Sequence, residues 1–379
     1  MHFARFVDDL VPFFAMEVME RGLELRRQGH DVLQLAVGEP AFEAPPPVIE
    51  ATMSALQRGE THYTSSRGLH SLCRAIADDC ERRRGVRVPP ERVIVTTGTS
   101  PAIYMTLRLL LDPGDEIIVP SPHYPCYPNM VVACSARPVF VPCDAADGYQ
   151  IDLERVRAAI TPRTRCILLS SPSNPTGAVQ SREVIEGLCE LGLPILSDEI
   201  YDGLVFDGAE VTSPLSLGAS CFVFDGFSKR YAMTGFRLGY VIVPEPALRP
   251  LQSMQQNFHI SASHFVQRAG FAALEQCAPY VERMVQTYAR RRRLLLDGLT
   301  QLGFGIAREP QGAFYVLADA RHLDTDSKRL AHDLLERAHV SIAPGRDFGE
   351  AAEGFLRFSY ATAEDQITRA IERLREALA

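Results

Sequence analysis

Short apolar segments alternate with helical or turn-rich segments through the middle of the chain, between Arg92 and about Ile242. Several of the apolar segments carry apolar residues at consecutive positions, as strands covered on both faces require. This alternation predicts an α/β domain with a mostly parallel sheet. The predicted strands are Val93–Thr96, Glu116–Pro120, Pro138–Pro142, Cys166–Ser170, Pro194–Ser197, Cys221–Phe224 and Leu238–Val243.

The last part of the chain has a different pattern. A long helical segment from about Val281 to Leu302 is followed by the strand-like PQGAFYVLADA, a helix near Ser327–Ala338 and a strand-like run over Phe355–Tyr360. This mixture predicts a smaller α+β domain. Because 379 residues exceed what one core usually supports, two domains are expected. We expect a large domain over residues 45–282, and an N-terminal arm and small domain over residues 1–44 and 283–379.

Composition and charge exclude several functional classes. The chain is 46% hydrophobic, and its net charge of −8 provides no broad cationic surface for nucleic acid. The basic run Arg290–Arg293 lies in a helical segment, and we interpret it as a solvated helix face. No apolar stretch is long enough to cross a bilayer. Asp8, Asp9 and Glu17 interrupt the apolar start, which lacks a small-residue cleavage site, so we expect no signal peptide.

Cysteine and histidine spacing gives no sign of disulfides or metal ligands. The nine cysteines contain no C-x-x-C pair, which favours reduced thiols in a cytoplasmic protein, most of them small core residues. The ten histidines include no H-x-x-x-H or H-E-x-x-H pattern. We therefore expect no metal site.

Polar residues follow several predicted strands, where ligands bind in parallel sheets. After the first strand comes TGTSP, followed by the helical AIYMTLRLLL. Ser100 suits the N-cap and Pro101 the first helical position, which leaves free N–H groups at Gly98 to Ser100. Such a helix start is a seat for phosphate. The alternative interpretation is an ordinary capped helix that binds no phosphate.

Two further predicted strands are followed by candidate ligand-binding residues. Asn174, in SPSNPTG, precedes a proline and so favours extended geometry, although a simple turn is the alternative. Asp198 ends an apolar strand, where a buried carboxylate is costly without a cationic partner.

Two basic residues are candidates for anion binding or covalent chemistry. Lys229 follows Ser228 and precedes Arg237 by eight residues, which indicates a lysine beside an anion site. A solvated surface loop is the alternative interpretation. Arg357 lies in a largely apolar strand-like run, where an anionic partner is plausible.

In combination, these segments resemble the class I/II aminotransferases, which are pyridoxal phosphate enzymes of fold type I. The resemblance rests on SPSNPTG, SDEIY, FSK, GFRLG and LRFSYA in the family's order and spacing, and it covers nearly the whole chain. It implies a large domain with a mostly parallel seven-stranded sheet, pyridoxal 5′-phosphate as cofactor, and transfer of an amino group from an L-amino acid to a 2-oxo acid. It also implies a homodimer whose active sites are shared at the interface.

The resemblance assigns catalytic roles to three residues. Lys229 corresponds to the Schiff-base lysine, which also acts as general base and acid between the substrate Cα and the cofactor C4′. Asp198 corresponds to the partner that keeps the cofactor ring nitrogen protonated. Tyr201, with Asn174, corresponds to a donor to the phenolic oxygen of the cofactor. Tyr124 corresponds to the aromatic residue that stacks on the ring.

The remaining assignments concern the phosphate and the substrate. Arg357 corresponds to the clamp on the substrate α-carboxylate, with Gly38 and Asn174 beside it. The counterpart of Tyr63 in the family reaches the phosphate from the neighbouring subunit. The other expected phosphate ligands are Gly98, Thr99, Ser100, Ser228 and Arg237.

The N-terminal segment bears on the substrate. Relatives that select acidic substrates often carry small hydroxyl residues where this chain has Phe13 and Phe14. No second arginine for a distal carboxylate is evident, although the partner subunit is an alternative source of one. These features favour a neutral or apolar substrate, although both phenylalanines could simply pack the N-terminal arm. The family's G-E-P-D-F is here G-E-P-A-F, and nothing functional follows from Ala41.

Three alternative functions need consideration. A β-lyase or other elimination enzyme would need the same Lys229, Asp198 and Arg357. A non-enzymatic regulator on this fold usually carries an added DNA-binding domain, for which the family match leaves no room, and would not need every catalytic residue. A nicotinamide dehydrogenase requires G-x-G-x-x-G after the first strand, which is absent.

Overall fold

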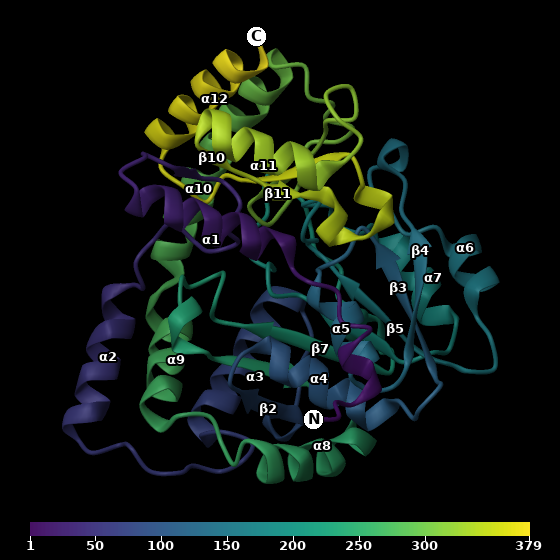
Figure 1. Cartoon of the computed structure of the whole chain (residues 1–379). Coiled ribbons are helices and arrows are strands. Elements are labelled where there is room, and N and C mark those ends of the chain that lie inside the picture. Colours follow the sequence, from purple (N-terminus) through teal and green to yellow (C-terminus); the bar gives the residue numbers. More distant parts are fainter.

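A seven-stranded sheet forms the centre of the larger part of the molecule, shown in the lower half of Figure 1. The computed structural model describes residues 1–379. β8 is antiparallel to both its neighbours, and every other adjacent pair is parallel, so the predicted mostly parallel sheet is confirmed. All seven predicted strands are present, with ends shifted by at most two residues. In spatial order they are β2 (Val93–Thr96), β8 (Gly239–Ile242), β7 (Cys221–Gly226), β6 (Ile195–Asp198), β5 (Thr164–Ser170), β3 (Glu116–Ser121) and β4 (Arg137–Pro142).

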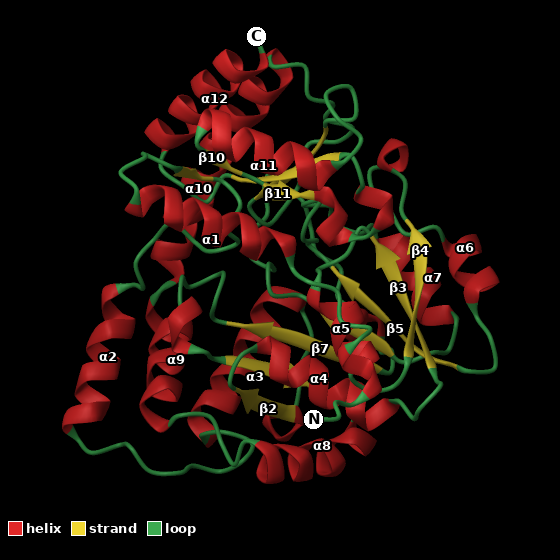
Figure 2. Ribbon diagram, in the orientation of Figure 1, coloured by secondary structure: helices red, strands yellow, loops and turns green.

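Helices cover both faces of this sheet, which explains the consecutive apolar residues in its strands (Figure 2). In β7, Cys221 and Val223 point into one core cluster, whereas Phe222 and Phe224 point into another. The first cluster includes residues of α2 (Pro46–Gln57), α3 (His70–Arg84), α6 (Leu153–Ala159), α7 (Arg182–Glu190) and α9 (His264–Gln276). The second includes residues of α4 (Thr99–Leu110), α5 (Cys126–Val132) and α8 (Glu245–Phe258).

A smaller α+β part lies at the top of Figure 1 and contains the C-terminus of the chain. Its strands form a three-stranded antiparallel sheet, β11-β12-β9, and a parallel pair, β1-β10. The proposed boundary between residues 282 and 283 falls inside α10, so the domain limits remain a proposal. The elements are α1 (Phe14–Arg27), β1 (Leu33–Gln34), α10 (Ala278–Gln301), β9 (Tyr315–Asp319), α11 (Ser327–Ala338), β10 (Val340–Ser341), β11 (Ala343–Pro344), β12 (Phe355–Ser359) and α12 (Glu364–Leu378).

None of these helices is both long enough and apolar enough to cross a membrane. All nine cysteines are free thiols, and seven of them are buried, as expected for small core residues.

The start of α4 differs from the sequence prediction. The helix begins at Thr99 with Gly98 as its N-cap, so Ser100 is not the cap and Pro101 is not the first helical residue. Gly98 has a φ of +104°, a conformation that glycine adopts without strain. This conformation turns the chain from β2 into the helix earlier than a serine cap would.

The basic run in α10 is not a uniformly solvated face. Arg292 is only 2% exposed, and its guanidinium carbon lies 5.1 Å from the centroid of the Phe206 ring. It pairs with Asp207 and Glu309. The interpretation of Arg290–Arg293 as a solvated face is therefore wrong for Arg292, because α10 packs this residue against the chain that follows β6.

Buried ion pairs join α3 to the ends of β6 and β7. The Arg84 side chain is 2% exposed, and it contacts Glu199 at 2.7 Å and Asp225 at 2.9 Å. Glu199 follows Asp198 directly, and Asp225 lies four residues before Lys229. The cluster therefore fixes the two strand ends that carry these predicted site residues.

We expect Arg84→Ala to lower the free energy of unfolding by about 3–5 kcal/mol, because the buried Glu199 loses its cationic partner and Asp225 keeps only Arg83. A denaturant titration would measure the change. Arg87→Ala is the matched control, because this arginine pairs with Glu81 but its side chain is 85% exposed. The control should lose less than about 0.5 kcal/mol, and equal losses in both variants would contradict the role given to the cluster.

Candidate active site

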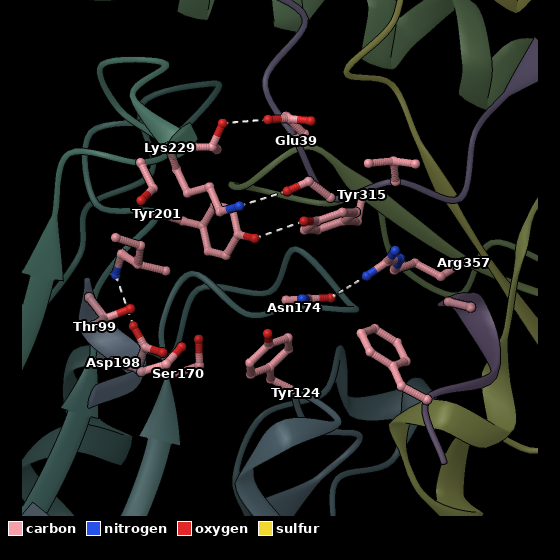
Figure 3. A pocket seen from close by; sticks show the side chains of 18 of the residues that line it. Glu39, Thr99, Tyr124, Ser170, Asn174, Asp198, Tyr201, Lys229, Tyr315 and Arg357 are labelled. Carbon is pink, nitrogen blue, oxygen red and sulfur yellow. Dashed lines mark hydrogen bonds between the residues drawn. The ribbon is translucent and has the colours of Figure 1, made fainter. Parts of the chain in front are cut away.

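A cavity of about 570 Å³ lies where the ends of the large-sheet strands meet the smaller part of the molecule. Eleven of the thirteen predicted site residues line it, and Figure 3 shows several of them converging on the same space. They are Gly38, Thr99, Ser100, Tyr124, Asn174, Asp198, Tyr201, Ser228, Lys229, Arg237 and Arg357.

The two other predicted residues lie outside this lining. Gly98 adjoins it, since a Cβ atom built on Gly98 would come within 2.5 Å of Arg237 Nη2. Glycine at this position therefore lets the guanidinium lie against the start of α4. Tyr63 is 79% exposed and does not reach the cavity of its own chain.

Lys229 places a buried amine in the cavity. Its Nζ donates a hydrogen bond to the Gly38 carbonyl at 2.6 Å, drawn as a dashed line in Figure 3. Burial lowers the pKa of this amine to about 8, and the nearby Glu39 carboxylate opposes the shift. A substantial fraction of the amine is therefore neutral near physiological pH, as a nucleophile or proton acceptor requires.

Asp198 places a buried carboxylate at the end of β6. It is 5% exposed and accepts hydrogen bonds from Tyr127 Oη at 2.6 Å and from the Ile200 N–H at 3.2 Å. Burial raises its pKa to about 6, although the bond from Tyr127 works in the opposite direction. No cation of the chain pairs with Asp198, so a cationic group in the cavity would supply the missing partner.

Arg357 reaches the cavity from β12. Its Nη1 donates to Asn174 Oδ1 at 3.0 Å, and its Nη2 donates to the Ala36 carbonyl. The guanidinium carbon lies 4.4 Å from the Tyr315 ring centroid and 4.8 Å from that of Phe348. The Nε atom is buried without a hydrogen-bond partner, which leaves donor capacity for an anion.

Tyr315 joins two predicted site residues and was missed in the sequence. Its hydroxyl lies 2.7 Å from that of Tyr201, and its ring packs on Arg357. Gly38 permits this arrangement, because a Cβ atom there would collide with the Tyr315 hydroxyl. The antiparallel pairing of β9 with β12 places Tyr315 diagonally across from Arg357, and that register was not evident from the sequence.

Tyr127 was also missed, although its position contained a signal. It lies in the first turn of α5, three residues after Tyr124, which comes just before the N-cap Pro125. Their rings meet edge to face with centroids 5.4 Å apart. The other polar lining residues that were not predicted are Glu39, Ser170 and Thr234.

A buried amine and an unpaired buried carboxylate in one cavity, beyond the ends of parallel strands, are typical of pyridoxal phosphate enzymes of fold type I. The chain belongs to the aminotransferase class I and II family, whose family model matches residues 30–374.

Individual relatives match over nearly the full chain. The aspartate/prephenate aminotransferase of Thermus thermophilus is 40% identical over 99% of this chain and 98% of its own length. An arginine–pyruvate transaminase of Pseudomonas aeruginosa is 36% identical over 95% of this chain and 93% of its own. The solved structure of the T. thermophilus aspartate aminotransferase with maleate has a TM-score of 0.95, at 40% identity and complete coverage of both chains.

These matches confirm the predicted family and fold, and they confirm that the protein is an aminotransferase that depends on pyridoxal phosphate. The residues of the cavity also fit this cofactor, independently of the relatives. The cavity contains a lysine that is partly neutral, a carboxylate that lacks a cation, and a helix start next to Arg237 that suits a phosphate.

We expect Glu39→Gln to lower the pKa of Lys229 further below about 8, because the Glu39 carboxylate favours the protonated amine. At a fixed pH near neutrality, more of the amine would then be neutral. The pH dependence of the labelling of Lys229 by an amine-selective reagent, in cofactor-free protein, would measure this shift.

Glu43→Gln is the control for that measurement, because Glu43 lies in the same segment but is exposed and outside the cavity. A Lys229 pKa that stays the same or rises in Glu39→Gln would contradict the assignment.

Proposed function

We propose that this aminotransferase acts on L-amino acids with neutral or apolar side chains, and that Lys229 carries protons at the substrate Cα. The observation that carries the assignment is the buried Lys229 amine, with its pKa lowered to about 8, in one cavity with the Arg357 guanidinium. The first group suits proton transfer near neutrality, and the second suits a carboxylate.

When bound, pyridoxal phosphate supplies an aldehyde that bonds to amines and a ring that accepts electrons. Lys229 would bind it covalently, and Asp198 would hold its ring nitrogen in the protonated form. The free N–H groups at the start of α4 would hold its phosphate. The full set proposed for cofactor binding is Tyr63, Gly98, Thr99, Ser100, Tyr124, Asn174, Asp198, Tyr201, Ser228, Lys229 and Arg237.

The substrate would be oriented by Arg357, with Gly38 and Asn174 beside it. A carboxylate bound by the guanidinium would find that group already fixed between two aromatic rings. Lys229 Nζ would take the proton from the substrate Cα and would deliver it to the C4′ carbon of the cofactor. Tyr201, held through its hydroxyl by Tyr315, would act with these residues as a donor at the cofactor's ring oxygen.

The wall formed by α1 supports a neutral or apolar side chain. Phe13, Met16 and Met19 line the cavity, whereas Phe14 lies under the Lys328 ammonium, 3.8 Å from its ring centroid. Of the two phenylalanines noted in the sequence, only Phe13 therefore faces the cavity. The cations in the lining are Lys229, Arg237 and Arg357, and each already has a proposed role. None is left for a distal carboxylate.

A homodimer with shared sites would bring Tyr63 of the partner subunit to the phosphate. An exposed apolar face on α2 supports this proposal, with Ile49 41%, Met53 56% and Leu56 46% exposed. Sedimentation that finds only monomers at micromolar concentration would contradict it.

The free thiols support a cytoplasmic location, which fractionation of expressing cells would test.

We expect leucine, methionine and phenylalanine to convert the bound cofactor to its amine form about tenfold more efficiently than aspartate or glutamate do. Each amino acid would be mixed with holoenzyme in the absence of a 2-oxo acid, and the cofactor absorbance followed. Lys229→Ala should show no conversion with any of them.

A preference for aspartate and glutamate would overturn the proposed substrate class. Stoichiometric release of pyruvate and ammonia from a cysteine conjugate, without an oxo acid, would instead favour the elimination chemistry of a β-lyase.

We expect Arg357→Ala to raise KM for amino acids about a hundredfold while changing cofactor affinity far less, because the substrate carboxylate loses its charged partner whereas Asn174 loses one hydrogen bond. Steady-state kinetics and cofactor titration would measure the two effects. Arg321→Ala is the control, since this arginine lies in the same part of the molecule with its side chain 58% exposed. Equal losses of substrate and cofactor affinity in Arg357→Ala would show that Arg357 is structural.

A further inference from the structure

A carboxylate far away in the sequence caps the helix that lines the substrate cavity. Asp347 lies in the short 3-10 helix η6 (Gly345–Phe348) and is 7% exposed. Its Oδ1 accepts the Phe14 N–H at 2.8 Å, and its Oδ2 accepts the Ala15 N–H at 2.7 Å. The N-cap residue of α1 is Phe13, whose side chain makes no capping bond. Asp347 therefore supplies the cap that the local sequence lacks.

The contacts with α1 are the only hydrogen bonds of this buried carboxylate, and the Arg357 charge also favours its ionised form. Asp347 forms no ion pair. Burial raises its pKa to about 6, which reflects the cost of enclosing the charge. The two backbone N–H groups at the start of α1, with the positive end of the helix dipole, are the compensation that the fold provides.

The first turn of α1 is also the side-chain wall of the cavity. Phe13, Ala15 and Met16 lie in or next to the capped turn, and all three line the cavity. The position of this wall therefore depends on where Asp347 holds the turn.

The residue after Asp347 supports the other end of the substrate site. The Phe348 ring packs against the Arg357 guanidinium at 4.8 Å. The turn itself has little freedom, since the His123 N–H donates to the Phe348 carbonyl at 3.0 Å. At Gly349, a Cβ atom would lie 2.7 Å from Ser121 Oγ. Two consecutive residues of one anchored turn thus contact the carboxylate clamp and the side-chain wall.

We propose that Asp347 is a positioning residue for substrate selection, which sets the distance between the α1 wall and Arg357 and so the size of side chain that is preferred. This inference rests on the proposed function, because it takes the α1 wall as the surface that meets the substrate side chain. It assigns Asp347 no contact with the reacting atoms.

The test compares a large apolar substrate with a small one. In Asp347→Ala, kcat/KM for phenylalanine should fall about tenfold, mainly through KM, because the wall loses its fixed position. For alanine, whose methyl group is too short to depend on the wall, the change should stay below about threefold. Cofactor affinity and absorbance should be unchanged.

Asp152→Ala is the matched control. Asp152 caps α6 by accepting the N–H groups of Glu154 and Arg155 at 2.9 and 3.1 Å, and it does not line the cavity. Its loss should leave the phenylalanine-to-alanine ratio unchanged. An unchanged ratio in folded Asp347→Ala would overturn the proposal.

Asp347→Asn addresses the case in which the alanine variant does not fold. It keeps the shape and one acceptor, so an intermediate change in the same ratio is expected, and a wild-type ratio would count against the proposal.

Hydrogen exchange separates this inference from the proposed function. In Asp347→Ala or Asp347→Asn, amides at the start of α1 should exchange faster than in the wild type, whichever amino acid the enzyme prefers. Faster exchange with an unchanged ratio would mean that the cap exists but does not select substrates. Unchanged exchange would refute the cap itself.

Discussion

The burial of opposite charges that do not neutralise each other is the constraint on which the site depends. The Lys229 amine and the Asp198 carboxylate both lie away from water. Burial lowers the pKa of the amine and raises that of the carboxylate, so the neutral form of each is favoured. A flexible surface could not hold such groups apart, because they would move to water or pair. The fold holds them at the rigid ends of β6 and β7, which the buried Arg84 cluster ties to α3.

The cavity exists only because the two parts of the molecule meet. The lysine and aspartate come from the large sheet, whereas Arg357 comes from β12 of the smaller part and Phe13 from α1. Asn174, after β5, receives a hydrogen bond from Arg357 and so links the two parts at the site itself. Tyr315 extends this link, since it contacts both Arg357 and Tyr201.

Much of the fold and of the site was predictable from local patterns. The seven strands were visible because both faces are covered, so that even adjacent residues such as Phe222 and Val223 must be apolar. Lys229 and Asp198 were visible because each follows a strand within a distinctive motif. The start of α4 was misplaced because a glycine, rather than the serine two residues later, makes the cap. The burial of Arg292 was missed because its partners lie in other segments.

The sequence by itself determined the fold class, the family and the identity of the principal site residues, because these depend on short-range periodicity and motifs. The tertiary structure decided which residues surround them. It showed that Phe13 faces the cavity while Phe14 lies under Lys328, that Tyr315 supports Tyr201, and that Asp347 caps α1. The Asp347 contacts join residues more than three hundred positions apart, and no local sequence pattern predicts a contact at that separation.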